Sequence, residues 1–123
     1  MRLKNKRILV TGSTTGIGKA IAQRFVREGA RVMIHGLEED LARETSAELD
    51  GAPWHVSDLS DPNVPSQLIE TSIRELGGLD GLVNNAGVVT RNQPADMSLA
   101  TWDWTYAINV RAPFLLIQSA LEE

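Results

Sequence analysis

Three glycines after a short apolar run are the residues whose spacing points most directly to chemistry. Residues 8–10 are Ile-Leu-Val and lead into Thr-Gly-Ser-Thr-Thr-Gly-Ile-Gly at 11–18, after which apolar residues recur at helical spacing. Glycines let the backbone approach an anion closely and adopt positive φ without strain. The first N–H groups of a following helix then point at that anion. The pattern predicts a strand, a phosphate-binding turn and a helix, with a purely structural glycine turn as the alternative.

The composition excludes several classes of function. The chain of 123 residues has a net charge of −4, no basic block and no cysteine. These features argue against nucleic-acid binding, disulfides and thiolate metal sites. The polar N-terminus is not a signal peptide, and no apolar run reaches the ~18 residues that a membrane span needs. We therefore expect one cytoplasmic domain over residues 1–123, without a membrane partner.

Two histidines stand on neighbouring predicted strands. His35 and His55 lack a third ligand, so we expect packed or surface histidines rather than a metal site.

Strand and helix patterns alternate four times along the chain. The predicted strands are 7–10, 31–35, 53–56 and 81–84. The predicted helices are 16–28, 38–50, 62–76, which Gly77 ends, and the region from 98 onward, which Ser98 caps. Ile17, Ile21 and Phe25 make the expected buried stripe of the first helix. Asp61 and Pro62 read as the cap and first turn of the third. Short connections and right-handed crossovers predict a parallel sheet in the order 3-2-1-4 with helices on both faces.

Four motifs along this framework resemble the short-chain dehydrogenases/reductases. They are Thr11-Gly12-x-x-x-Gly16-Ile17-Gly18, Asp58, Asn84-Asn85-Ala86-Gly87 and Asn109 within Ala-Ile-Asn-Val. The resemblance covers the whole chain in the family's order. It implies an α/β fold with a Rossmann-like doubly wound parallel sheet that binds NAD or NADP, and an oxidoreductase that transfers hydride between that cofactor and an alcohol or carbonyl substrate.

The resemblance also implies which residues bind the cofactor. The glycine turn would line the pyrophosphate and ribose, and Asp58 and Leu59 would meet the adenine. Asn84, Ala86 and Gly87 would lie along the adenosine ribose. Asp58 could instead cap a local turn, and the asparagines could tie the end of the fourth strand to neighbouring backbone. The full set is Gly12, Ser13, Thr15, Gly16, Ile17, Gly18, Gly36, Leu37, Asp58, Leu59, Asn84, Asn85, Ala86 and Gly87.

The charges after the second strand bear on the choice between NAD and NADP. A carboxylate about twenty residues past the glycine turn would bind the ribose 2′-hydroxyl of NAD, but Gly36 occupies that place. Glu38 and Glu39 follow closely and would repel a 2′-phosphate, and no Lys or Arg lies between Gly36 and Asp40. We expect NAD rather than NADP; a solvated helix start is the alternative role for the two glutamates.

The family's catalytic residues are mostly missing from these 123 residues. Asn109 matches the family's catalytic asparagine, but its serine and Tyr-x-x-x-Lys pair lie further along. Tyr106 is the only tyrosine, and Val110 rather than lysine stands four residues later. Pro113 lacks an N–H and crowds the carbonyl of Asn109, which predicts a kinked helix with a free carbonyl there. The chain alone is expected to be a truncated, inactive cofactor-binding portion.

Other readings stay open. The chain could be a stand-alone nucleotide-binding module or sensor, or an interaction protein in which the glycine turn is a relic. The fourth strand would be a sheet edge, and exposed edges recruit partners. We therefore expect a homo-oligomer that forms through this edge or through the last helix.

Overall fold

Short apolar runs form the central sheet of the computed structural model, which describes residues 1–122. The strands are β1 (Arg7–Val10), β2 (Arg31–Gly36), β3 (Trp54–Val56) and β4 (Gly81–Val83). They are parallel and lie in the order β3-β2-β1-β4, as the sequence predicts. Val10 stands opposite both Ile34 and Val83, so β1 and its two neighbours end at the same edge of the sheet.

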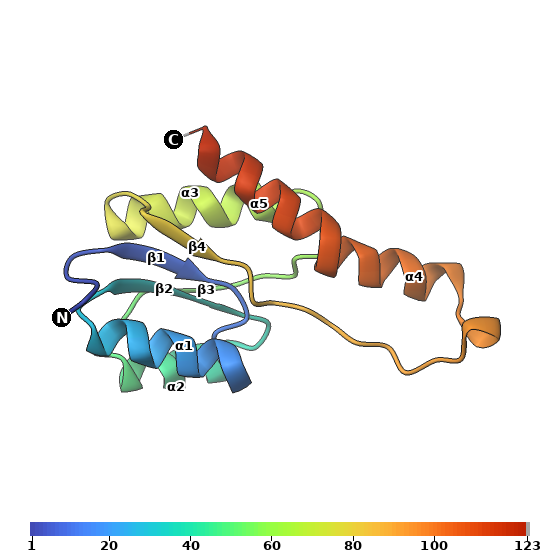
Figure 1. Cartoon of the computed structure of the whole chain (residues 1–123), viewed down its shortest axis with the longest axis horizontal. Coiled ribbons are helices and arrows are strands. Elements are labelled where there is room, and N and C mark those ends of the chain that lie inside the picture. The colour runs from blue at the N-terminus through green and yellow to red at the C-terminus, as the bar shows by residue number, and fades with distance from the viewer. Residues whose placement is uncertain (123) are drawn as a thin grey trace.

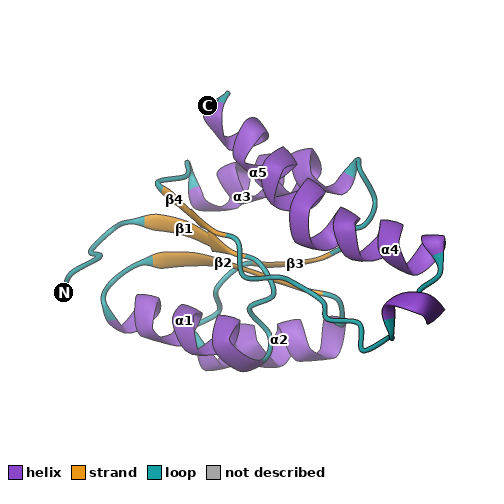
Figure 2. Cartoon of the chain, turned by 45° about the vertical axis from the view of Figure 1, so that its right-hand side comes forward, coloured by secondary structure: helices purple, strands orange, loops and turns teal. Residues whose placement is uncertain are grey.

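Helices cover both faces of this sheet (Figure 2). Ile8 and Val10 point into a core beneath α1 and α2, whereas Leu9 and Met33 point into a second core beneath α3 and α5. This alternation follows from the two-residue period of a strand, and it explains why consecutive residues in the middle of β1 and β2 are apolar. The helices are α1 (Gly16–Arg27), α2 (Glu39–Glu48), α3 (Val64–Leu76), α4 (Leu99–Tyr106) and α5 (Ala112–Leu121).

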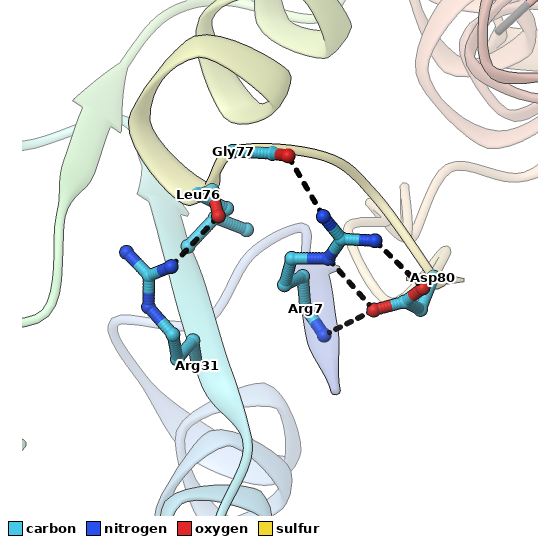
Figure 3. A network of polar contacts seen from close by, with 5 residues as sticks. All are labelled: Arg7, Arg31, Leu76, Gly77 and Asp80. Atoms are coloured by element: carbon cyan, nitrogen blue, oxygen red, sulfur yellow. Dashed lines mark hydrogen bonds and ion pairs between the residues drawn. The ribbon is translucent and has the colours of Figure 1, made fainter. Parts of the chain in front are cut away.

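An arginine clamp fixes the amino ends of the strands to the end of α3 (Figure 3). The Arg7 guanidinium donates to Asp80 Oδ2 at 2.9 Å and to Asp80 Oδ1 at 3.1 Å, and its Nη1 donates to Gly77 O at 2.7 Å. Hydrogen bonds from Arg7 lower the pKa of Asp80 to about 2. Arg31 on β2 donates to Leu76 O at 2.8 Å. The clamp closes one end of the sheet and leaves the carboxyl ends of the strands open.

The start of α3 differs from the sequence prediction, which placed the cap at Asp61 and the first-turn proline at Pro62. The helix begins at Val64, with Pro65 in its first turn. Asp61 Oδ1 accepts from Asn63 N at 2.9 Å and Asp61 O accepts from Val64 N at 3.1 Å. The aspartate therefore forms its own local turn, a known competitor of helix capping.

The predicted buried stripe of α1 is wrong at its first member. Ile17 is 76% exposed, whereas Gly18 and Ala22 are buried. The first turn of α1 lies at the open edge of the sheet, where Ile17 lines a pocket instead of the core.

The last helical region consists of three pieces. Ser98 caps α4 as predicted, because its Oγ accepts from Thr101 N at 3.1 Å. A π-helical segment, Ala107–Arg111, joins α4 to α5, and Ala112 N donates back to Ala107 O. The segment ends two residues before Pro113, where the sequence predicts a disturbance; the free carbonyl of Asn109 stays a prediction. In Figure 1, α4 continues α5 beyond the sheet.

The connection from β4 to α4 is extended apart from one 3₁₀ turn at Pro94–Asp96. Within residues 1–122, no helix combines the length and hydrophobicity needed to cross a membrane.

Candidate functional site

A pocket of about 630 Å³ lies at the open edge of the sheet. In parallel α/β sheets, ligands bind outside the carboxyl ends of the strands, where connections leave in opposite directions. Here β1 leads to α1 on one face and β4 leads toward α5 on the other (Figure 2). The lining residues are Gly12, Thr14, Thr15, Gly16, Ile17, His35, Gly36, Leu37, Glu38, Leu41, Asp58, Leu59, Asn85, Ala86, Gly87, Val88, Trp104 and Ile108.

Most of the predicted site residues meet in this pocket. Ser13, Gly18, Asn84 and Asn109 are the exceptions: each is absent from its lining. Asn84 borders a separate hollow between β4 and α5, together with Leu82 and Ile117.

The glycine turn has the backbone geometry that its sequence predicts. Gly12 and Gly16 have φ of +61° and +55°, a region that favours glycine. A Cβ on Gly12 would lie 3.0 Å from Ala86 Cα, and a Cβ on Gly18 would collide with Gly12 O and Asn85 Nδ2. Gly18 is therefore required for close packing beneath the turn rather than at the pocket surface.

The N-terminus of α1 opens toward the pocket. Thr15 at the N-cap makes no side-chain capping bond, and the first turn carries no acidic residue. The first hydrogen bond of the helix runs from Lys19 N to Thr15 O at 3.1 Å. The N–H groups of residues 16–18 precede that bond, and the positive end of the helix dipole lies with them. This arrangement suits an anion.

Two neighbouring strands hold the turn in place. On the β4 side, Asn85 Nδ2 donates to Thr11 O at 3.2 Å and to Gly12 O at 3.1 Å. The Thr11 hydroxyl accepts from the N–H groups of Asn85 and Ala86. The alternative role of Asn85, tying the strand end to backbone, is thus confirmed.

On the β2 side, Ser13 faces His35 and not the pocket. Ser13 N donates to His35 O at 2.7 Å, and Ser13 Oγ accepts from His35 N at 3.0 Å. Ser13 is fully buried, so its hydroxyl shapes the turn from behind.

The His35 ring contributes two further bonds. Its Nδ1 accepts from Gly12 N at 3.1 Å, and its Nε2 lies 3.1 Å from Ser57 O. Because Gly12 N–H is a donor and Ser57 O is an acceptor, the ring must carry its proton on Nε2. Burial lowers the pKa of His35 to about 4, which keeps the ring neutral.

The pocket wall formed by the loops after β2 and β3 is acidic. Glu38 and Asp58 are the charged residues of the lining. Arg43, the nearest cation in sequence, is engaged on α2 with Glu39 at 2.8 Å. Asp58 Oδ1 accepts from Ser60 N at 2.9 Å, which confirms a local-turn role for that carboxylate. A Cβ on Gly36 would lie 2.7 Å from Thr14 Oγ1, so glycine is required where β2 passes the turn.

Three apolar residues of the pocket lining were missed by sequence reasoning: Val88, Trp104 and Ile108, which line the pocket together with Ile17 of α1. Helical spacing does not show that Trp104 of α4 reaches a pocket at the edge of the sheet, so no local signal marked it. His35 was expected to be either a packed or a surface histidine, and the structure shows that it is packed. The parallel register of β1 with β2 places it beside the glycine turn. No three His, Cys, Asp or Glu side chains within residues 1–122 are grouped to hold a metal ion.

Comparisons with known proteins agree with this geometry. A family model described as short chain dehydrogenase matches residues 6–123. The short chain dehydrogenase/reductase dpmpG of Macrophomina phaseolina is 35% identical over 97% of this chain and 71% of its own length. The 2-(S)-hydroxypropyl-CoM dehydrogenase 3 of Xanthobacter autotrophicus is 37% identical over 98% of this chain and 49% of its own.

Solved structures with the same fold include complexes with nicotinamide cofactors. A short chain dehydrogenase from Burkholderia cenocepacia in complex with NADP has a TM-score of 0.96 and 35% identity, covering 100% of this chain and 52% of its own. A blue fluorescent protein from a metagenomic library in complex with NADPH has a TM-score of 0.93 and 34% identity, covering 100% of this chain and 53% of its own. The chain thus spans about half the length of these two structures, and the Rossmann-like fold is confirmed.

Proposed function

Because this chain belongs to the short-chain dehydrogenase family, we propose that its 123 residues form the nicotinamide-dinucleotide-binding part of an oxidoreductase. That oxidoreductase would transfer hydride between the cofactor and an alcohol or carbonyl substrate. The observation that carries the proposal is the uncapped N-terminus of α1, which opens into a pocket at the carboxyl edge of the sheet. A pyrophosphate is the cofactor group that such a helix end attracts.

The pocket supports an assignment of each part of the cofactor. The pyrophosphate would lie against the N–H groups of residues 16–18. The adenosine ribose would lie beside Gly36, Leu37 and Glu38, and the adenine beside Asp58 and Leu59, all of which line the pocket. Gly12, Ala86 and Gly87 would form the floor, whereas Ser13, Gly18 and Asn85 position the turn through their packing and hydrogen bonds.

We expect NAD rather than NADP as the cofactor. The charged groups of the pocket lining are the carboxylates Glu38 and Asp58, and no lysine or arginine accompanies them. A 2′-phosphate beside Glu38 would meet repulsion without a cation to balance it. The solved relatives named above bind NADP and NADPH, so the preference rests on the charges of this chain alone.

These residues are expected to bind the cofactor without turning over a substrate. Proton transfer to a substrate oxygen needs an acid within hydrogen-bonding reach and with a suitable pKa. Tyr106, the only tyrosine, is half-exposed and has Val110 where the family's lysine would stand. Asn109, the one matching catalytic position, uses its side-chain amide to bind Val88.

Fluorescence titration with NADH and NADPH in parallel tests the proposal. Trp104 lines the pocket, so NADH bound there should accept energy from its indole and reduce tryptophan emission. We expect saturable binding that is tighter for NADH. Absence of saturation with both cofactors would refute cofactor binding, and tighter NADPH binding would refute the NAD preference alone.

Self-association remains part of the proposal. Trp102, Tyr106, Val110 and Phe114 recur at four-residue spacing along the α4–α5 rod and are each close to half exposed or more. β4 pairs only with β1 among the described strands, so its other edge is open. Light scattering should detect a dimer or larger species; a monomer at working concentration would contradict this expectation.

A further inference from the structure

His35 is a buried ionisable residue that lines the pocket and contacts two separate loops, the turn after β1 and the loop after β3. Only 2% of its surface is exposed. Its ring meets the glycine turn at Gly12 and the loop after β3 at Ser57. Polar groups buried this deeply are costly unless their hydrogen bonds are satisfied, and both ring nitrogens of His35 are satisfied.

The two contacts depend on each other. Gly12 N–H needs an unprotonated Nδ1, because a protonated nitrogen cannot accept. Ser57 O favours the tautomer with hydrogen on Nε2, which leaves Nδ1 free to accept. The Ser57 carbonyl after β3 therefore keeps His35 Nδ1 unprotonated, and this nitrogen accepts the hydrogen bond from Gly12 in the turn after β1.

We propose that His35 is a positioning residue for dinucleotide binding. Ser57 O fixes its neutral ring in one tautomer, and the ring then holds the backbone of Gly12 in place. This contact fixes the conformation of the glycine turn that leads to the N-terminus of α1. The inference rests on the proposed function, because it assigns the role to the pyrophosphate end of the same pocket. Without the Nδ1 acceptor, Gly12 N–H would be left unpaired. The turn would then lose the hydrogen bond that fixes Gly12, the residue from which the backbone leads to the N-terminus of α1.

Three other titratable groups lie on the adjacent strand or line the same pocket, and their effect on a pH profile must be separated from that of His35. His55 on β3 adds a small unfavourable interaction with protonated His35. Glu38 and Asp58 line the same pocket after β2 and β3. Wild type and His35→Asn both retain His55, Glu38 and Asp58, so a comparison of these two proteins removes the contribution of the three residues to the pH profile.

The chain offers a matched control for His35. His55 lies on the adjacent strand, directly opposite His35 in the register, and its Nδ1 lies 3.2 Å from Ser57 Oγ. It does not line the pocket or contact the glycine turn. His55→Asn therefore perturbs the same strand pair and the same serine without touching Gly12.

The experiment measures NADH affinity and thermal stability of wild type, His35→Leu, His35→Asn and His55→Asn at pH 7.5. We expect His35→Leu to weaken NADH binding about tenfold, the effect of one lost hydrogen bond together with an unpaired donor. His35→Asn places an amide oxygen near the Nδ1 position and should recover binding to within about threefold. His55→Asn should change the affinity for NADH less than about twofold. We expect this even if His55→Asn and His35→Leu lower the melting temperature equally.

The outcomes separate the two proposals. Wild type that fails to bind NADH overturns the proposed function and this role with it. Wild type that binds while His35→Leu binds equally well overturns only the role of His35, as does affinity that tracks melting temperature across all four proteins. If His35→Leu does not fold, the pH profiles decide. Wild-type affinity should weaken below about pH 5 relative to His35→Asn, and parallel profiles would refute the proposal.

Discussion

Asn109 holds both backbone polar groups of Val88. Its Oδ1 accepts from Val88 N at 2.8 Å, and its Nδ2 donates to Val88 O at 2.7 Å, across 21 residues of sequence. Val88 lines the pocket, whereas Asn109 lies in the π-helical segment between α4 and α5. One side-chain amide thus joins the loop after β4 to the long helical rod.

Asn109→Asp should break this clamp. A carboxylate cannot donate to Val88 O and would face it with like partial charge, so we expect a loss of about 1–2 kcal/mol in the free energy of unfolding. Urea denaturation measures that loss, and hydrogen exchange should show faster opening at Val88. Asn84→Asp makes the same chemical change at another exposed asparagine, whose side chain makes no hydrogen bond within residues 1–122, and should be close to neutral. Equal effects of the two substitutions would show that the clamp contributes nothing specific.

Gly18→Ala and Gly16→Ala should differ although both glycines belong to one motif. A Cβ at residue 18 would meet Gly12 O and Asn85 Nδ2, whereas at residue 16 it would enter open space. Gly16 has φ of +55°, so alanine there costs only the backbone strain of about 1 kcal/mol. We expect Gly18→Ala to abolish saturable NADH binding and Gly16→Ala to retain it in weakened form. The reverse order, measured by the same titration, would contradict the packing role of Gly18.

Glu38→Gln should reduce the difference between the affinities for NADH and NADPH. The substitution removes a negative charge from the pocket wall and leaves the side-chain shape nearly unchanged. We expect NADPH binding to improve severalfold, with NADH affinity changed far less. Glu39→Gln is the control, because Glu39 pairs with Arg43 and does not line the pocket. Unchanged NADPH affinity in Glu38→Gln would remove the electrostatic basis for the NAD preference.

The neutral state of His35 predicts how stability depends on pH. Burial lowers its pKa from 6.5 to about 4, so the unfolded chain takes up the proton first as the pH falls. The contribution of His35 to the free energy of unfolding is fully present above pH 6.5 and declines between pH 6.5 and 4. The total loss is about 3 kcal/mol. Urea denaturation across this range should show the decline in wild type and a shallower one in His35→Asn. Identical slopes would mean that His35 does not stay neutral in the folded protein.

The arginine clamp should act in a lower pH range. The pKa of Asp80 is lowered to about 2, so its contribution is present above its ordinary value of 3.8 and is lost as the pH falls through 2. Arg7→Lys keeps the charge but cannot form the fork to Asp80 and the bond to Gly77 O together. We expect a lower melting temperature at neutral pH. Arg24→Lys is the control, because the Arg24 side chain is exposed and keeps its charge opposite Glu28, and it should leave the melting temperature almost unchanged.

Sequence reasoning recovered the elements whose signals are local. Apolar runs mark the strands, Ser98 marks the start of α4, and Gly77 marks the end of α3, where the structure gives it a φ of +80°. The strand order follows once short right-handed connections are assumed between these elements. Sequence reasoning failed where two local preferences compete. Asp61 can cap a helix or close a turn, and the choice fell to the turn because its carboxylate reaches Asn63 N.

In the candidate site too, residues in local motifs could be predicted, whereas residues placed by contacts between distant elements could not. The glycine turn and the loops after β2, β3 and β4 could be placed from motifs and topology, because parallel strands bring their carboxyl ends to one edge. Ile17, Trp104 and the bonds of His35 depend on where elements distant in sequence meet. Periodicity assigns Ile17 to the buried face, but it cannot show that the first turn of α1 projects past the core.

The contact between Gly36 and Thr14 constrains the order in which this chain could acquire a ribose-binding acid. Any side chain at residue 36 would place its Cβ 2.7 Å from the Thr14 hydroxyl oxygen and methyl carbon, and Thr14 is buried and β-branched, so it has little freedom to rotate away. Gly36→Asp would therefore damage the fold before it could improve cofactor recognition. A smaller residue at position 14 has to come first, which makes the two positions epistatic: the benefit of the second substitution exists only in the background of the first.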